Sequence, residues 1–257
     1  MVAWLGAALK GIGIGLSIIV PGMSGGTAAV ILGIYEELIG AIKQVDLKVL
    51  APVGVGAAVG LLGGARVVEF LFITYPFIIS SFLIGLIAAS SRQLLGSVKK
   101  WGFRQVAVGL TGLAGALLLS VPMWGQTDAV GSLSVVRLLV GGMVAAAAMI
   151  IPGISGASVL ILLGQYRAIL EAVNDLLIIP LAIFGVGAVI GLGLFSRLIS
   201  YFLREHPGGT AALLGGLIVG SVRAIWPQHI GPTEVMAFII GVALVEVFEM
   251  IAGTERG

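Results

Sequence analysis

The sequence contains an internal repeat that spans most of its length. Residues 10–92 align with residues 141–223 without a gap, at a constant offset of 131. The register holds through a Pro-Gly-x-Ser-Gly motif at residues 21–25 and 152–156, and through glycines, arginines and prolines far beyond it. A register kept this long indicates a duplicated structural unit, so the fold has to be built from two similar halves.

The chain is also apolar almost throughout. Of its 257 residues 59% are hydrophobic and only 10% are charged, and its mean hydropathy is +1.17. Soluble domains carry about one quarter charged residues. Apolar stretches of about 18 residues or more recur along the chain, and each is long enough to cross a bilayer. We therefore expect an all-α integral membrane protein with a single membrane domain over residues 1–257 and no cleaved signal peptide.

Each half is predicted to contain one broken, glycine-rich segment followed by three apolar helices. In the first repeat, residues 10–123, these elements cover 10–43, 48–73, 76–95 and 104–123. In the second repeat, residues 137–251, they cover 137–174, 176–201, 208–225 and 233–251.

A re-entrant hairpin is the expected shape of each broken segment. As one helix, residues 10–43 would reach about 50 Å, whereas the hydrocarbon core is about 30 Å thick and the first arm alone would reach about 16 Å. Each repeat then crosses the membrane three times, so the two repeats have inverted topology. Hairpins place nine lysines and arginines on one side and three on the other, against four and eight for crossing segments. The positive-inside rule then predicts that both termini are cytoplasmic.

The Pro-Gly-x-Ser-Gly motif predicts a non-helical tip in each hairpin, because proline lacks a backbone donor and glycine permits unusual dihedral angles. Irregular backbone at membrane depth is stable only inside protein or beside a polar cavity. We therefore expect the amides and hydroxyls of the two tips to bind an anion where the tips meet. The candidate residues are Gly22, Ser24, Gly25, Gly26, Thr27, Gly153, Ser155, Gly156 and Ser158. The alternative is that each motif only kinks a helix and its small residues serve close packing.

Arg66 and Arg197 occupy equivalent positions inside apolar helices. A guanidinium can hold a phosphate through two parallel hydrogen bonds, so one arginine from each half would suit a phosphate headgroup. The alternatives are that the side chains extend to the membrane surface, or that Arg66 pairs with Glu69 one turn on. Arg92 and Arg223 lie near helix ends, where extension to the surface is expected.

Tyrosines and carboxylates offer further candidates with simpler roles. Tyr35 and Tyr166 are expected to anchor the chain at the membrane surface, as are the tryptophans near segment ends. Glu246 and Glu249 share one side of the last helix, where they would either take up a proton during transport or face water.

Enzyme chemistry finds little support in the sequence. The chain has no cysteine and no metal-ligand spacing, and no histidine lies near Ser24 or Ser155. No catalytic residue, metal or cofactor is therefore expected. No basic run interleaved with aromatic residues indicates nucleic acid.

The paired motifs resemble those of the bacterial polyprenyl-phosphate transporter family. The resemblance rests on residues 10–36 and 151–166 and extends over nearly the whole chain. It implies transport of undecaprenyl phosphate, the carrier lipid of peptidoglycan and other envelope polymers, back to the cytoplasmic leaflet of the bacterial cytoplasmic membrane. The partners expected are this lipid, the bilayer and a coupling ion, either a proton or sodium. Ala157 and Ser158 replace Gly26 and Thr27 in the second motif, so the two half-sites are unequal.

The mechanism expected is alternating access around the two tips. The lipid phosphate would enter from the outer leaflet, and rocking of the repeats would expose its headgroup to the cytoplasm, with the charge shielded from hydrocarbon throughout. Two other classes stay open. One is a transporter of small soluble anions, which a lateral gap between helices would argue against. The other is a phosphatase acting on a lipid pyrophosphate, which would need an acid and a base near the tips.

Overall fold

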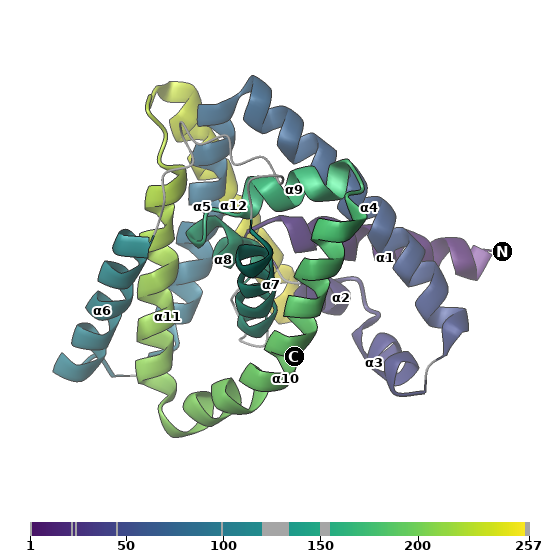
Figure 1. The fold of residues 1–257 in the computed structure, drawn as a ribbon, viewed down its shortest axis with the longest axis horizontal. Coiled ribbons are helices and arrows are strands. Elements are labelled where there is room, and N and C mark those ends of the chain that lie inside the picture. Colours follow the sequence, from purple (N-terminus) through teal and green to yellow (C-terminus); the bar gives the residue numbers. More distant parts are fainter. Residues whose placement is uncertain are drawn as a thin grey trace.

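A computed structural model of the chain describes residues 2–21, 23, 25–44, 46–98, 100–119, 134–149 and 155–254. Every regular element in these ranges is helical. The elements are α1 (Val2–Ile19), α2 (Gly25–Ile31), α3 (Tyr35–Gln44), α4 (Leu47–Thr74), α5 (Pro76–Gly96), α6 (Phe103–Leu119), α7 (Val135–Ala148), α8 (Gly156–Leu162), α9 (Tyr166–Asn174), α10 (Ile178–Glu205), α11 (Pro207–Ser221) with a 3-10 turn at Val222–Ile225, and α12 (Pro232–Thr254) (Figure 1).

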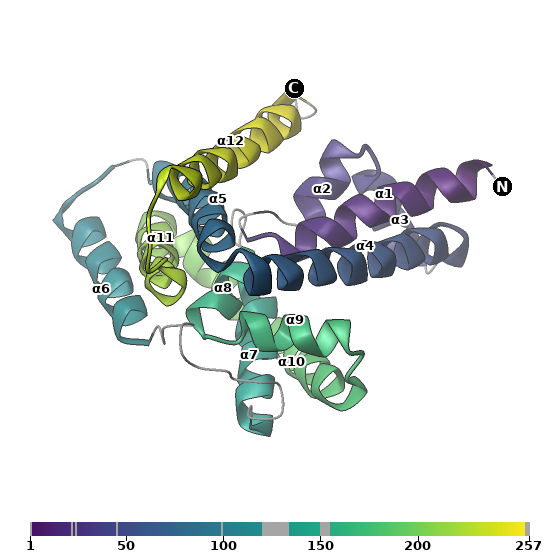
Figure 2. The ribbon, with the colours of Figure 1, turned by 90° about the horizontal axis from the view of Figure 1, so that it is seen from above.

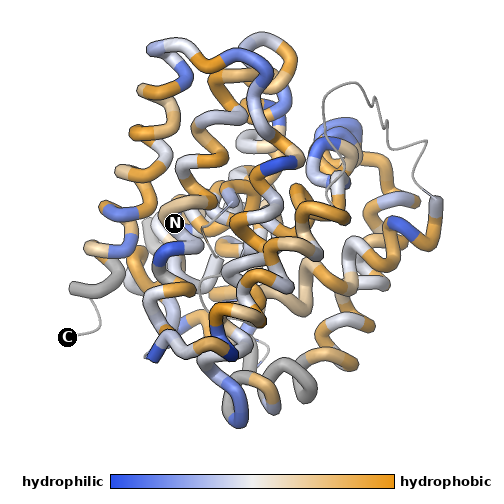
Figure 3. Tube along the Cα trace, turned by 90° about the vertical axis from the view of Figure 1, so that its left-hand side faces the viewer, coloured by the Kyte–Doolittle hydropathy of each residue, from blue (hydrophilic) through white to orange (hydrophobic). Residues whose placement is uncertain are grey.

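The described helices have the length and surface of membrane-spanning elements. Four of them are long and apolar enough to cross a bilayer: Leu47–Thr74, Pro76–Gly96, Ile178–Phe195 and Pro207–Ile225. Apolar residues recur along the helices of the molecule, with the hydrophilic residues interspersed among them (Figure 3). On α10, the side chains of Ile179 and Val189 are 74% and 72% exposed. Such apolar surface matches lipid and not water, so the prediction of an all-α membrane protein is confirmed at this level.

The helices recur at the sequence offset of 131. Helices α2, α3, α4 and α5 begin 131 residues before α8, α9, α10 and α11, respectively. Each copy also places a glycine with positive φ, Gly33 at +63° and Gly164 at +66°, between its short helix and the helix that follows. Glycine adopts this conformation without a steric penalty, so the chain turns there. The glycine turn lies inside each predicted broken segment, residues 10–43 and 137–174, and divides it a second time.

In each half the chain reverses its direction after the first helix. A β-carbon added at Gly25 would lie 3.4 Å from Ile14, and one added at Gly13 would lie 2.9 Å from Leu32, so α2 runs back along α1. Gly156 lies against α7 in the same way. The first arm is longer than predicted, because α1 begins at Val2 and its 18 residues reach about 27 Å. The length of α1 therefore does not require a re-entrant hairpin, and the re-entrant hairpin stays a prediction.

Glycines allow the backbones of paired helices to touch. A β-carbon added at Gly56 or Gly60 of α4 would lie about 2 Å from the carbonyl oxygen of Ala8 or Ile12 of α1. Gly187 and Gly191 of α10 face α7 in the same way. Small residues that let helices approach this closely are typical of membrane interfaces. They explain why α1 packs on α4 and α7 packs on α10.

The last two helices of each half pack on the other half. Helix α5 pairs with α12, and α6 pairs with α11 (Figure 2). Backbone contacts mark both pairings, with Gly85 on Phe238 and the equivalent Gly216 on Gly109. The two halves are therefore interlocked, and both contribute to one core that includes Leu83, Ile87 and Ala212.

Candidate functional site

The structure describes part of each Pro-Gly-x-Ser-Gly motif. Gly22, Ser24 and Gly153 lie outside the described residues. Gly25, Gly26 and Thr27 form the first turn of α2, and Gly156 and Ser158 lie in the first turn of α8. Ser155 precedes α8 as its N-cap and accepts a hydrogen bond from the Ala157 N–H at 3.3 Å. Serine is favoured at this position because its hydroxyl satisfies an amide that the helix cannot.

The two motifs meet through Ser155. Its hydroxyl donates a hydrogen bond to the carbonyl oxygen of Val20, 3.4 Å away and directly before Pro21. Both Ser155 and Ser158 are only 3% exposed, and Pro21 is fully buried. The structure thus brings a polar side chain of the second motif onto the backbone at the first, inside the protein, where irregular backbone is tolerated.

Tyr166 makes a second link between the halves. Its side chain is 3% exposed and its hydroxyl donates a hydrogen bond of 2.9 Å to the carbonyl oxygen of Ile19, at the end of α1. Its ring packs edge-on against Phe72 of α4, and the guanidinium of Arg167 lies 5.7 Å from the centre of that same Phe72 ring. The prediction that Tyr166 anchors the chain at the membrane surface was therefore wrong. Tyr35, its counterpart, is 41% exposed.

Arg66 lies in α4 and Arg197 lies in α10. Arg66 is exposed, and its side chain makes no hydrogen bond or ion pair with the residues that the structure describes. Glu69 accepts a hydrogen bond from the Asn174 side chain, so it is engaged with α9 and not with Arg66. For Arg197 the structure describes the backbone alone. No arginine clamp on the tips is present among the described contacts, and a role for Arg66 in binding stays a prediction.

Arg92 and Arg223 each contact a helix of the other half of the molecule. Arg92 of α5 forms an ion pair with Glu246 of α12 at 2.7 Å. Arg223 donates a hydrogen bond of 2.7 Å to the carbonyl oxygen of Leu117 in α6. These contacts link α5 to α12, and the turn after α11 to α6, at equivalent positions of the two repeats. Sequence reasoning missed this role. Glu246, a candidate proton carrier, is thus engaged in an ion pair.

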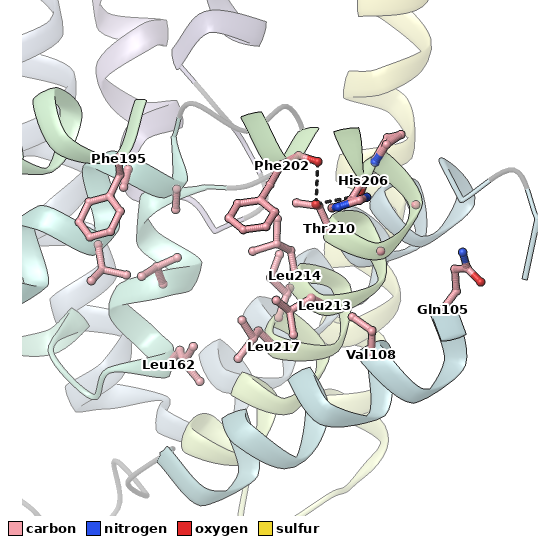
Figure 4. Close-up of a pocket in the computed structure, with 18 of the residues that line it drawn as sticks. Gln105, Val108, Leu162, Phe195, Phe202, His206, Thr210, Leu213, Leu214 and Leu217 are labelled. Carbon is pink, nitrogen blue, oxygen red and sulfur yellow. Dashed lines mark hydrogen bonds between the residues drawn. The ribbon is translucent and has the colours of Figure 1, made fainter. Parts of the chain in front are cut away.

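A cavity of about 640 Å³ lies beside the second motif, between α6, α7, α8, α10 and α11. Figure 4 shows His206 and Thr210 near one end, and Leu162 and Leu217 further along the wall. Ser158 lines the cavity as well, so the cavity reaches the second tip. Sequence reasoning did not find it, because most of its lining consists of the apolar residues expected in any membrane helix.

Together, these features define a multi-pass helical membrane protein with a polar contact between its two Pro-Gly-x-Ser-Gly motifs, made by the buried Ser155, and an apolar cavity beside the second motif. The chain belongs to the undecaprenyl phosphate translocase-like family, which it matches over residues 14–53 and 43–239. A protein of Vibrio cholerae named polyprenyl-phosphate transporter is 33% identical over 246 residues, which cover 87% of this chain and 78% of that protein. A protein of Staphylococcus aureus with the same name is 29% identical, over 92% of this chain and 90% of its own length. No solved structure matches the chain.

Proposed function

We propose that the protein transports polyprenyl phosphate across the bacterial cytoplasmic membrane, returning undecaprenyl phosphate from the outer to the cytoplasmic leaflet for the synthesis of peptidoglycan and other envelope polymers. The observation that carries the proposal is the contact of Ser155 with Val20, which joins the two motifs in a chain whose relatives are named polyprenyl-phosphate transporters. A duplicated site at the junction of two halves is the arrangement that transporters built from repeats use.

The phosphate would bind where the two motifs meet. Candidate donors are the hydroxyls and amides of residues 22–27 and 153–158, with Arg66 and Arg197 as the cationic partners. Because α2 and α8 have only seven residues each, the hydroxyls and the guanidinium groups would supply most of the attraction. Arg66 is exposed and makes no hydrogen bond or ion pair with the described residues, so its guanidinium is available to a phosphate.

The two halves would have inverted topology, with both termini in the cytoplasm and hairpins entering from opposite faces. The pairings of α5 with α12 and of α6 with α11 are those that a two-fold relation between the halves would generate, and such a relation is compatible with inverted topology. The count of nine positive residues against three supports it as well. Alternating access would then consist of rocking of one half on the other around the place where the two motifs meet.

Reconstitution into liposomes tests the proposal directly. The accessibility of undecaprenyl phosphate in the two leaflets is measured with the parent protein, with the variants Arg66→Ala and Arg197→Ala, and with Lys48→Ala as a surface control. We expect the parent to equilibrate the lipid, the arginine variants to be slower by about tenfold or more, and the control to match the parent, since a charged hydrogen bond contributes about 1.5 to 3 kcal/mol.

The outcomes separate the two parts of the proposal. A parent that leaves the lipid in its original leaflet would overturn the transport function. Normal transport by both arginine variants would remove only the arginines from the site.

A further inference from the structure

The cavity beside the second motif has apolar walls and a polar opening, as a binding site for an amphiphilic molecule does. Its walls are apolar over most of their length, with Phe195, Phe202, Leu214 and Leu217 among them (Figure 4). Its polar residues gather where α6 begins and where α10 joins α11: Arg104, Gln105, Glu205, His206 and Thr210. An apolar pocket with a few convergent polar groups is the usual form of a ligand site.

Donors for an anion lie at this polar mouth. Arg104 is exposed and makes no hydrogen bond or ion pair with the described part of the chain. Gln105 uses its carbonyl oxygen to accept the Gly102 N–H at 3.2 Å, which leaves its amide NH₂ available. The Thr210 hydroxyl donates its hydrogen to the Phe202 and His206 carbonyl oxygens. Arg104 and Gln105 are therefore the groups placed to hold a phosphate, against the like charge of Glu205.

The open space lies beside the motif of the second half, under α6 of the first half. The cavity separates α6 from α8, since Val108 and Leu162 face it from the two sides. The counterpart of α6 is α12, and α12 packs against α2, the counterpart of α8. There Phe248 of α12 joins the cluster of Ile14, Ala28 and Ile34. The two halves thus differ in whether the last helix covers the short helix of the motif.

We infer that this cavity is a second binding site for the lipid, with the isoprenoid chain along its apolar wall and the phosphate held at its mouth by Arg104 and Gln105. This inference rests on the proposed function, which supplies the lipid. Ser158 connects the cavity to the buried motifs, so a lipid held here lies next to the place where the motifs meet. The apolar walls suit part of an extended isoprenoid chain, whereas a small soluble anion would leave them unfilled.

Binding of two lipids to the purified protein in detergent tests the inference. Undecaprenyl phosphate carries the anion, and undecaprenol has the same chain without it. Val108→Trp narrows the cavity and is expected to weaken binding of both lipids by about tenfold, because it displaces buried apolar contacts. Leu110→Trp, two residues along α6 on a surface that is 59% exposed, is the matched control and should bind as the parent does.

Charge variants address the mouth of the cavity. Arg104→Ala should weaken binding of the phosphate about tenfold and leave undecaprenol unchanged, while Glu205→Gln should strengthen binding of the phosphate alone, since a like charge is removed. Equal effects of either change on both lipids would overturn the assignment of the phosphate to the mouth. Parent-like binding of both lipids by Val108→Trp would overturn the assignment of the chain to the wall.

Photolabelling of the unaltered protein avoids any folding defect in the variants. Undecaprenyl phosphate with a diazirine at the far end of its chain should label α6 and α11 at residues that line the cavity. Label confined to the outer surfaces of α4 and α10 would overturn the inference. If the parent transports the lipid but is labelled only on those outer surfaces, the cavity is not a lipid site and the proposed transport function stands. If the cavity is labelled but liposomes show no transport, the function fails and the site stands.

Discussion

Tyr166 and Ser155 are single residues that tie the two halves together at the ends of their first helices. Each donates its hydroxyl to a carbonyl at the end of α1, Tyr166 to Ile19 and Ser155 to Val20. The last carbonyl groups of a helix have no partner within the helix, so the Tyr166 hydroxyl satisfies such an acceptor at Ile19. The Val20 carbonyl also accepts the Met23 N–H at 3.2 Å, so Ser155 adds a second donor there. Tyr35, the counterpart of Tyr166, is half exposed, and the halves are therefore unequal at this position.

Removing the Tyr166 hydroxyl should destabilise the protein. We expect Tyr166→Phe to lower the free energy of unfolding by about 1 to 2 kcal/mol, because the buried carbonyl of Ile19 loses its partner. Tyr35→Phe is the matched control and should lie within about 0.5 kcal/mol of the parent. Thermal unfolding in detergent measures both, and equal stability of the two variants would show that the Tyr166 hydrogen bond contributes little.

Helix pairs in this protein are held by glycines that let two backbones touch. Gly60 of α4 faces the carbonyl of Ile12, whereas nothing lies within 4 Å of the position where Gly63 would carry a β-carbon. The same contrast recurs in α10, where Gly191 faces Met143 and Gly193 faces open space. Position on the helix therefore decides whether a glycine is needed.

A single methyl group at the contact glycines should force the helices apart. Gly60→Ala and Gly191→Ala are each expected to cost about 1 to 3 kcal/mol, since the added carbon would lie 2.2 Å from a backbone oxygen. Gly63→Ala and Gly193→Ala should leave stability unchanged or slightly raised, because alanine favours helix more than glycine does. Thermal unfolding compares the pairs, and a similar loss at all four positions would mean that space at the interface is not what these glycines provide.

The sequence predicts the long helices well and their partners poorly. Helix α4 was expected over 48–73 and spans Leu47–Thr74, because a long apolar run has clear polar ends. The turn at Gly33 lies within an apolar run and was missed, although Gly164 matches it in the repeat. Gly85 and Gly216 indicate that another helix approaches closely, but the sequence does not identify that helix. The cavity depends on the angle between α10 and α11, which no local pattern encodes.

At the scale of the whole molecule, the protein consists of two similar halves, and the last two helices of each half pack on the other half. The orientation of the two halves relative to each other in the membrane decides the mechanism. Gln44 at the end of α3 and Asp175 after α9 occupy equivalent, exposed positions 131 residues apart. The side of the membrane on which each of these residues lies therefore tests whether the repeats are inverted.

Cysteine labelling can read this orientation, since the chain has no cysteine of its own. With inverted repeats, a membrane-impermeant maleimide should label Asp175→Cys from outside the cell, and should label Gln44→Cys only after the membrane is permeabilised. Labelling of both variants from the same side would mean that the repeats are parallel and would exclude inverted topology.

The pairing of α5 with α12 and of α6 with α11 also limits when the fold can form during synthesis. The first half leaves the ribosome with α5 and α6 in place, but their partners α12 and α11 lie more than 100 residues further along the chain. Until these are inserted, the glycine faces of α5 and α6 have only lipid against them. Native pairing therefore waits for nearly the whole chain, and a ribosome that stalls between the halves would leave a membrane-inserted product that cannot complete its fold.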